Sequence, residues 1–121
     1  GATDGMLIWI EKPNERDCVE ASVGVKKFFC GRKKKFGLNL QGVCDGKGRF
    51  LDVSIGHPAS TSDFLSFSAS PIYHKLEDGL LGKGLCFFGD NAHVNTNYMA
   101  APYFNVKSGT KDDYNFYHSQ V

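Results

Sequence analysis

The sequence lacks the marks of a membrane or secreted protein. It has no apolar stretch long enough for a transmembrane helix, no signal-peptide pattern and no Asn-x-Ser/Thr glycosylation acceptor. The net charge is only +1, so no global field attracts nucleic acid or membrane. Any such interaction therefore has to depend on a local cluster of charge.

The cysteines form no metal or disulfide motif. Among Cys18, Cys30, Cys44 and Cys86 there is no CxxC pair and no Cys/His grouping at zinc-ligand spacing. Cys44 and Cys86 lie in apolar runs, where we expect reduced, buried thiols. These features favour an intracellular protein, nuclear or cytoplasmic.

What is present fits a globular chain. With 41% hydrophobic and 22% charged residues, the composition is not that of a disordered protein. A length of 121 residues suits one core, so we expect a single domain over residues 1–121. The chain begins at Gly1 without an initiator Met and closes inside a helical pattern, so we expect it to be a piece of a longer protein.

Hydrophobic periodicity predicts a mixture of strands and helices. Strands are expected over residues 6–10, 36–44, 50–55 and 85–88, with a hairpin turn at 45–48. Helices are expected from 14 to near 24, over 61–68 and 71–77, and from a capping arrangement at 110–113 onward, with a short helical turn at 98–101. This order predicts an α/β layer fold, in which an antiparallel meander precedes a helical crossover to a later strand.

Two aspartates lie at the ends of apolar runs. Asp4, in Thr-Asp-Gly, precedes the first run, and Asp90, in Gly-Asp-Asn, follows the last. Carboxylates at strand ends, with glycine beside them, suit a hard cation such as Mg²⁺. Asp-Gly and Gly-Asp are also ordinary turn dipeptides, so spacing alone leaves a metal site and a pair of turns open.

A basic stretch interleaved with phenylalanine is a second candidate site. Its cations are those of Lys26, Lys27, Arg32, Lys33, Lys34 and Lys35. They could contact DNA phosphates, or they could be the solvated lysines of a strand edge.

Histidines give a weaker signal. His93 and His57 lie in loops near Asp90 and Asp63, where each could approach a site or be a hydrogen-bonded loop residue. No nucleophile motif such as GxSxG occurs.

Four ordered segments carry a family resemblance that covers nearly the whole chain. They are GATDGMLIWIEKP, CGRKKKFGLNLQGVCDGKGRFLDVSIGHPASTSDF, GDNAHVNTNYMAAPYFN and KDDYNFYHSQV. Together they resemble the DDE superfamily endonuclease domain of PIF/Harbinger-type transposases. The resemblance implies an RNase H-like fold, with a three-strand antiparallel meander and a helical crossover, incomplete at the C-terminus.

The resemblance also implies roles for individual residues. Asp4 matches the first acid of the family's metal site, although Met6-Leu7-Ile8 replaces Thr-His-Ile. Asp90 matches the second acid, with Asn91-Ala92-His93 in place of Ser-Gly-Tyr. Asp63 matches a further aspartate, which we expect to orient the site rather than to hold a metal, and His93 is a second residue of this secondary kind.

The family's third acid is a glutamate that follows an Asn-x-x-His-x-x-x-Arg-like run. That run matches Asn115, His118 and the residues to Val121, and the sequence stops before the arginine and the glutamate. We therefore offer no residue of this chain as the third acid.

The implied activity is metal-dependent cleavage of DNA phosphodiester bonds by a transposase-type endonuclease. Two divalent cations, Mg²⁺ or Mn²⁺, would lie about 3.5–4 Å apart between the carboxylates. With one acid missing, we expect the longer parent protein to be the enzyme and this chain alone to cleave weakly or not at all. The alternative is a domesticated, non-catalytic module that binds DNA or protein. Target choice would belong to a separate DNA-binding segment or partner protein.

Overall fold

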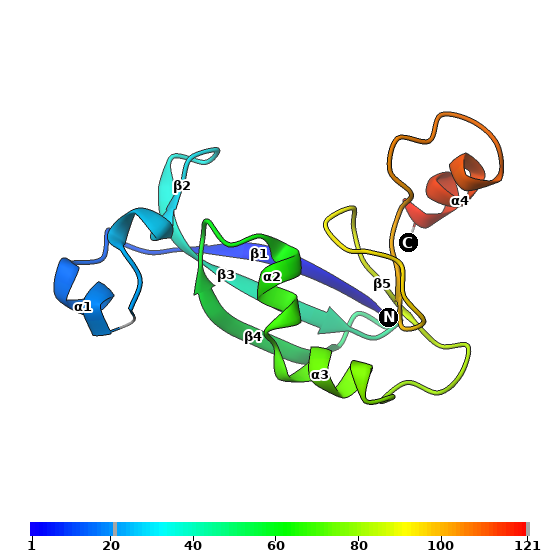
Figure 1. The fold of residues 1–121 in the computed structure, drawn as a ribbon, viewed down its shortest axis with the longest axis horizontal. Helices are drawn as coiled ribbons and strands as arrows, with labels where there is room; N and C mark the ends of the chain where they lie inside the picture. The colour runs from blue at the N-terminus through cyan, green and yellow to red at the C-terminus, as the bar shows by residue number, and fades with distance from the viewer. Residues whose placement is uncertain (21, 121) are drawn as a thin grey trace.

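The computed structural model describes residues 1–20 and 22–120 (Figure 1). Its strands are β1 (Ala2–Trp9), β2 (Phe29–Cys30), β3 (Lys35–Cys44), β4 (Phe50–Pro58), β5 (Phe87–Phe88) and β6 (Met99–Ala100). Its helices are α1 (Glu15–Glu20), the 3-10 turn η1 (Val25–Phe28), α2 (Asp63–Ser68), α3 (Pro71–Glu77) and α4 (Thr110–His118).

The sheet confirms the predicted meander and crossover. β1 pairs antiparallel with β3, and β3 pairs antiparallel with β4. The chain then passes through α2 and α3 and returns in β5, which lies parallel to β1 and is followed by the parallel strand β6. The strand order β2-β3-β1-β5-β6, with β4 on β3, is consistent with an RNase H-like fold.

Helices α2 and α3 cover one face of this sheet (Figure 1). α3 begins at Pro71 as the sequence predicts, whereas α2 begins at Asp63 and not at residue 61. The N-caps of the two helices are Ser62 and Ser70. The apolar core between the helices and the sheet consists of Val43, Phe67, Ile72, Leu76, Phe87 and Met99.

The other face of the meander is open to solvent in the described part of the chain. Successive side chains of a strand point to opposite faces. Met6 of β1 and Val53 and Ile55 of β4 lie opposite the helix-covered face, and they are 59%, 48% and 50% exposed. The described helices therefore bury one side of the sheet and leave apolar side chains on the other.

All four predicted strands have different bounds in the structure. β3 starts one residue earlier, and β4 runs on to Pro58, so His57 lies in a strand and not in a loop. β1 begins at Ala2 rather than residue 6, so Asp4 lies within the strand and not before it. Pairing with β3 from Ala2↔Cys44 onward extends the strand through Thr3, Asp4 and Gly5, which carry no apolar signal. β5 is shorter than predicted, because Leu85 belongs to a turn in which its N–H donates to Gly82 O at 3.1 Å.

Several expectations for turns and helix ends were wrong. The predicted helical turn at 98–101 is strand β6, since Phe87 N donates to Tyr98 O and Gly89 N donates to Ala100 O, each at 2.9 Å. The helix expected to run from 14 to near 24 is the shorter α1, Glu15–Glu20, and η1 begins only at Val25, beyond the predicted end. The N-cap of α4 is Gly109, which has no side chain to cap the helix, and not the predicted arrangement at 110–113.

The expectation that Cys44 and Cys86 are reduced and buried is met only in part. All four cysteines are free, but Cys18 is the buried one, while Cys44 and Cys86 are half-buried.

Among the described residues, no helix combines the length and the hydropathy needed to cross a membrane.

Candidate active site

The structure brings Asp4 and Asp90 into one pocket. Ala2 of β1 pairs with Phe88 of β5 in parallel, and the two aspartates are each two residues further along. Neighbouring strands lie about 4.7–4.9 Å apart, so Asp4 and Asp90 occupy matched positions on adjacent chain segments. Both are exposed, and both line a cavity of about 780 Å³, here called the aspartate pocket, together with Phe88, Tyr103 and His118.

Local hydrogen bonds fix the backbone around each carboxylate. Asp4 Oδ1 accepts from Gly5 N at 2.8 Å. Asp90 Oδ1 accepts from Ala92 N at 2.9 Å, and Asp90 O accepts from His93 N at 3.2 Å, which together close a tight turn after β5. Asp90 is thus a turn residue, as one of the two alternatives predicted. This does not prevent metal binding, because the side-chain hydrogen bonds of Asp4 and Asp90 use only one oxygen of each carboxylate.

Asp63 is the first residue of α2 and lies on the helix-covered side of β1. Its Oδ1 accepts from Asn39 Nδ2 and from Gln41 Nε2, each at 3.0 Å. A Cβ built on Gly5 would lie 2.6 Å from Asp63 Cγ, so the carboxylate packs directly on the β1 backbone. Because side chains alternate along β1, Asp4 points away from this face. Asp63 is therefore adjacent to the aspartate pocket without lining it.

The side-chain amides that hold Asp63 are not among the site residues predicted from the sequence. The alternation in residues 36–44 was correctly interpreted as a half-buried strand, but the buried positions include the polar residues Asn39 and Gln41, which are only 2% exposed. Gln41 Nε2 also donates to Asn39 Oδ1 at 2.7 Å, and Asn39 Nδ2 donates to Thr61 O at 3.1 Å. Two amides at i and i+2 in a strand are the signal that could have predicted this buried polar network.

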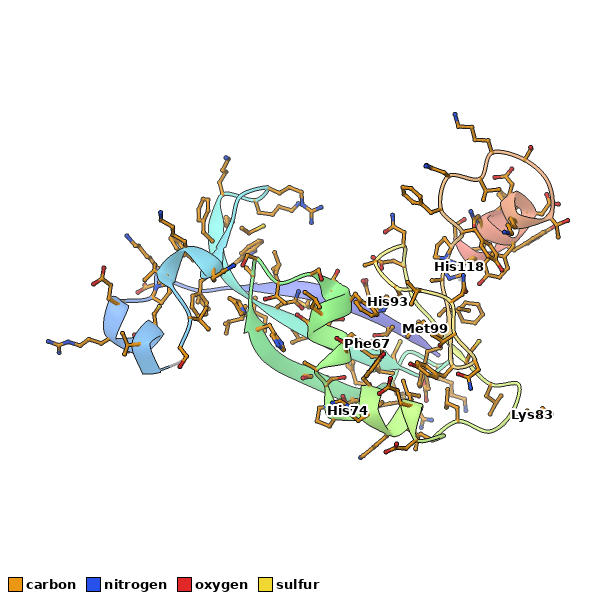
Figure 2. The ribbon with its side chains drawn as sticks, in the orientation of Figure 1. Phe67, His74, Lys83, His93, Met99 and His118 are labelled. Atoms are coloured by element: carbon orange, nitrogen blue, oxygen red, sulfur yellow. The ribbon has the colours of Figure 1, made fainter. Side chains whose placement is uncertain are left out.

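His93 is a buried residue of the turn that follows Asp90. It is 7% exposed, and its ring packs edge-on against Phe67 at a centroid distance of 5.2 Å, between α2 and the loop after β5 (Figure 2). Burial lowers the pKa of His93, although the carboxylates of Asp90, Asp63 and Asp4 act in the opposite direction. His93 therefore favours the neutral form while lying within the field of all three aspartates.

Helix α4 closes the aspartate pocket from the side. Asn115 accepts from Tyr103 N at 2.7 Å and donates to Tyr103 O at 2.8 Å, so one side chain satisfies both backbone groups. His118 Nε2 lies 3.1 Å from Ala100 O, and its ring packs on Phe88 at 5.5 Å. These are the two residues that match the family's Asn-x-x-His run. Val121, which ends that match, lies outside the described residues.

The basic stretch does not border the aspartate pocket. All six cations are exposed: Lys26 and Lys27 in η1, Arg32, Lys33 and Lys34 in the turn between β2 and β3, and Lys35 at the start of β3. The β2–β3 turn lies on the side of the molecule that carries α1, away from α4 (Figure 1). Arg32 and Lys33 instead line a second pocket, beside residues 5–9 of β1.

The donor atoms of the aspartate pocket suit a hard cation. Mg²⁺ usually takes one or two protein carboxylates and completes its shell with water and substrate phosphates. Asp4 and Asp90 supply such carboxylates. Within residues 1–20 and 22–120, no group of three or more His, Cys, Asp or Glu side chains is placed to hold a metal ion. The described residues thus fit a two-carboxylate site and not a complete three-acid site.

Fold and sequence together define the class of this protein. A mixed sheet of RNase H-like order, with an acid on β1 and another after the parallel strand β5, is the architecture implied by the resemblance. The chain matches the DDE superfamily endonuclease family over residues 3–120, and it belongs to that family, of Harbinger type. Searches of curated proteins and of solved structures found no match.

Proposed function

We propose that this chain is the core of a metal-dependent DNA endonuclease of the transposase type. The observation that carries the proposal is the matched position of Asp4 and Asp90 on neighbouring parallel segments, in one pocket. Family membership supports the reaction class, because DDE endonucleases act on phosphodiester bonds. The site would act on DNA bound along the exposed surface around this pocket.

Each site residue has a distinct part in this proposal. Asp4 and Asp90 would hold Mg²⁺ or Mn²⁺. When bound there, the cations would supply activation of the attacking hydroxyl and stabilisation of the leaving oxygen. Asp63 fixes the β1 backbone at Gly5, and His93 fills the space between α2 and the turn that carries Asp90. The cations of residues 26–35 would contact DNA phosphates.

We further propose that this chain alone has little or no cleavage activity. Two carboxylates can share one cation with substrate phosphates, but a second cation would be held weakly. The described residues offer no third acid beside Asp4 and Asp90. The parent protein would supply the missing acid, and a DNA-binding segment or partner protein would supply target choice.

A non-catalytic module is the second candidate function. The residues that follow Asp4 differ from the family's Thr-His-Ile, and one of them, Met6, is an exposed apolar residue. A domesticated chain that binds DNA or protein would tolerate such a change.

We infer that the protein acts in the nucleus or cytoplasm. The four free cysteines support this inference, because thiols stay reduced in those compartments.

The test of the proposed function is Mn²⁺ binding together with nicking of supercoiled plasmid. We expect a single class of Mn²⁺ site that Asp4→Asn and Asp90→Asn each weaken at least tenfold, since each removes one charged ligand. Asp78→Asn, at the exposed end of α3, is the matched control and should change nothing. Equal Mn²⁺ affinity in all variants would refute the site. DNA binding and Mn²⁺ binding without any nicking, even in a longer chain, would favour the non-catalytic module.

A further inference from the structure

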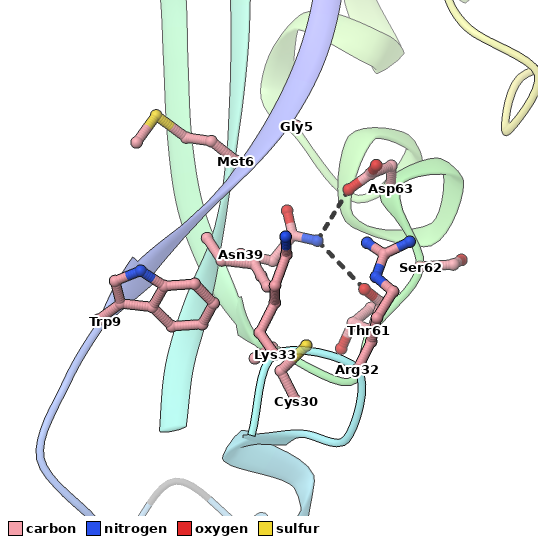
Figure 3. A pocket seen from close by; sticks show the side chains of 12 residues that line it. Gly5, Met6, Trp9, Cys30, Arg32, Lys33, Asn39, Thr61, Ser62 and Asp63 are labelled. Carbon is pink, nitrogen blue, oxygen red and sulfur yellow. Dashed lines mark hydrogen bonds between the residues drawn. The ribbon is translucent and has the colours of Figure 1, made fainter. Parts of the chain in front are cut away.

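A second pocket lies along the part of β1 beyond the aspartate pocket. Its cavity volume is about 350 Å³, within the range of small-ligand sites of about 300–1,000 Å³. Gly5, Trp9, Arg32, Lys33, Asn39 and Asp63 are among its lining residues (Figure 3). We call this cavity the Trp9 pocket. The aspartate pocket includes residues 2–4 of β1 and the Trp9 pocket includes residues from 5 to 9, so one strand connects the two.

Trp9 supplies an aromatic wall that is not part of the core. The side chain is 42% exposed. Its position opposite Gly37 leaves the ring over a residue without a side chain, and a Cβ built on Gly37 would lie 3.2 Å from a Trp9 ring carbon. Lys35 Nζ lies 5.4 Å from the ring centroid. An exposed indole with a cation beside it is the arrangement on which proteins stack nucleic-acid bases.

Arg32 and Lys33 supply positive charge at the mouth of the same pocket. Both lie in the turn of the β2–β3 hairpin, which is closed by a 2.7 Å bond from Lys34 N to Cys30 O and by packing of Phe29 on Phe36. Figure 3 shows both side chains directed toward the space between Trp9 and the start of α2. Among the described residues, neither takes part in an ion pair, so their charges are available to an anion.

The wall facing the cations is polar and fixed. The Asn39 amide donates to Thr61 O and to Asp63 Oδ1, as the dashed bonds in Figure 3 show. Gln41 Nε2 donates to both Asn39 Oδ1 and Asp63 Oδ1. The pocket thus combines an aromatic face, two cations and a preorganised polar wall in one cavity.

We propose that the Trp9 pocket takes one unpaired nucleotide of a DNA strand, with its base against Trp9 and its phosphate on Arg32 and Lys33. The inference rests on the proposed function to the extent that the nucleotide belongs to the DNA on which the chain acts. Binding in this pocket needs neither the metal nor Asp4 and Asp90.

An unpaired nucleotide fits better than a base pair. A base inside a duplex presents only its edges in the grooves, so its face cannot reach an aromatic side chain in a concave pocket. A base that has left the stack exposes both faces, and every base can stack on Trp9 in this way. The five residue steps from Asp4 to Trp9 span about 16 Å of strand, which places this nucleotide within about five nucleotides of the aspartate pocket.

Trp9 reports on its own pocket, because it is the single tryptophan in the sequence. We would titrate the chain with a mixed-sequence single-stranded 12-mer, with the same sequence as a blunt duplex, and with a deoxynucleoside monophosphate, and follow tryptophan emission. We expect saturable quenching by the single strand, weaker quenching by the duplex, and weak binding of the monophosphate, which lacks the neighbouring phosphates. Tight binding of the monophosphate alone would mean a free-nucleotide pocket and would overturn the DNA assignment.

Matched variants locate the effect. Arg32→Ala combined with Lys33→Ala should lower both the quenching at saturation and the salt dependence of binding, the latter by about 1.4 in slope for two lost contacts on a single strand. Lys75→Ala combined with Lys83→Ala removes the same charge from two exposed lysines outside both the pocket and the basic stretch, and should leave the quenching at saturation unchanged. If the two pairs behave alike, the pocket assignment is wrong.

Variants of Trp9 are followed by the anisotropy of a labelled 12-mer. Trp9→Ala should weaken binding about 5- to 150-fold, the range for loss of one base–aromatic stack. Trp9→Phe keeps an aromatic face, so it should retain most of the affinity, and it serves if the alanine variant does not fold. Unchanged affinity in a folded Trp9→Ala chain would refute the proposal.

The two proposals fail separately. The quenching should persist in Asp4→Asn, whatever that variant does to Mn²⁺ binding. If no Mn²⁺ site is found but the quenching is intact, the nuclease proposal fails and the nucleotide pocket stands. If Mn²⁺ binds as expected but no quenching occurs, the nucleotide pocket fails and the nuclease proposal stands.

Discussion

The carboxylate of Asp63 occupies the space that a side chain at Gly5 would need. A Cβ on Gly5 would lie 2.6 Å from Asp63 Cγ, and Asn39 and Gln41 hold the Asp63 carboxylate in place. The glycine that follows Asp4 therefore has a packing reason, which is close approach of α2 to β1. Through this contact, the first turn of α2 fixes the position of β1 beside Asp4.

Gly5→Ala should destabilise the fold by about 1–3 kcal/mol, the usual cost of overpacking a buried site. The added methyl group has to displace a carboxylate that two amides hold. Urea unfolding measures the change. Gly46→Ala is the control, because a Cβ there meets nothing within 4 Å.

The cost of Gly5→Ala should shrink in an Asp63→Ala background, since the obstructing carboxylate is then absent. A double-mutant cycle isolates that coupling. Additive effects of the two substitutions would show that the contact between Gly5 and Asp63 has no energetic weight.

Asp63→Ala and Asp63→Asn should separate hydrogen bonding from charge. Alanine leaves one N–H of each amide, Asn39 and Gln41, without an acceptor, while their bonds to Thr61 O and Asn39 Oδ1 remain. The cost is about 1–3 kcal/mol for each buried group left unpaired. Asparagine keeps an acceptor oxygen and should lose much less. Chemical denaturation gives both values. If Asp63→Asn is as damaging as Asp63→Ala, the negative charge and not the hydrogen bonding is what the fold requires.

Stability should fall on acidification because of His93. Burial lowers the folded-state pKa of His93 below its ordinary value of 6.5. Above that value the imidazole is neutral in both states, and its contribution to stability is complete. As the pH falls from 6.5 toward the folded-state pKa, the unfolded chain binds a proton that the folded chain does not, so the free energy of unfolding decreases. Below the folded-state pKa the loss stops growing.

The measurement for His93 is the free energy of unfolding between about pH 7.5 and 5, a window centred near the ordinary histidine pKa. His93→Gln should flatten the profile, even if it lowers stability throughout. His74→Gln is the matched control, because the His74 side chain is 66% exposed. A His93→Gln profile as steep as that of the parent chain would assign the pH dependence to other groups.

Asn115 should control how firmly α4 closes the aspartate pocket. Asn115→Ala removes two hydrogen bonds to Tyr103, each with a net value of about 0.5–1.5 kcal/mol. Hydrogen exchange of the α4 amides should accelerate accordingly. Asn115→Asp keeps the acceptor for Tyr103 N and loses the donor to Tyr103 O, so its effect should be intermediate. Asn97→Ala, an exposed loop asparagine, should leave the exchange of α4 unchanged. Unaltered exchange in Asn115→Ala would contradict the anchoring role.

The arrangement of the sheet was predictable from the sequence because alternating side chains and turn residues are local patterns. Alternating side chains around the turn at 45–48 predicted the hairpin of β3 and β4, and Pro71 marked the start of α3. Strand β6 was missed because a two-residue strand is defined by its partner, β5, and not by its own periodicity. The start of β1 was missed for the same reason, since its polar residues are held by pairing with β3.

The residues of the candidate site were predicted less completely than the sheet. The family resemblance pointed to Asp4, Asp63 and Asp90, and the structure places Asp4 and Asp90 in one pocket and Asp63 in another. The amides of Asn39 and Gln41 were not singled out, because a polar residue in an alternating strand is normally assigned to the solvent side. The separation of the basic stretch from the aspartate pocket depends on the direction in which β1 runs, and no local pattern encodes it.

The most direct test of the account is the position of bound Mn²⁺, read from paramagnetic broadening of amide signals in the NMR spectrum of the chain. The account predicts that substoichiometric Mn²⁺ broadens residues 3–5 and 89–91 first, and that the broadening is lost when Asp4→Asn and Asp90→Asn are combined. Broadening centred on another acidic segment, such as Asp112 and Asp113, or persistence of the same pattern in the double variant, would contradict a metal site between Asp4 and Asp90.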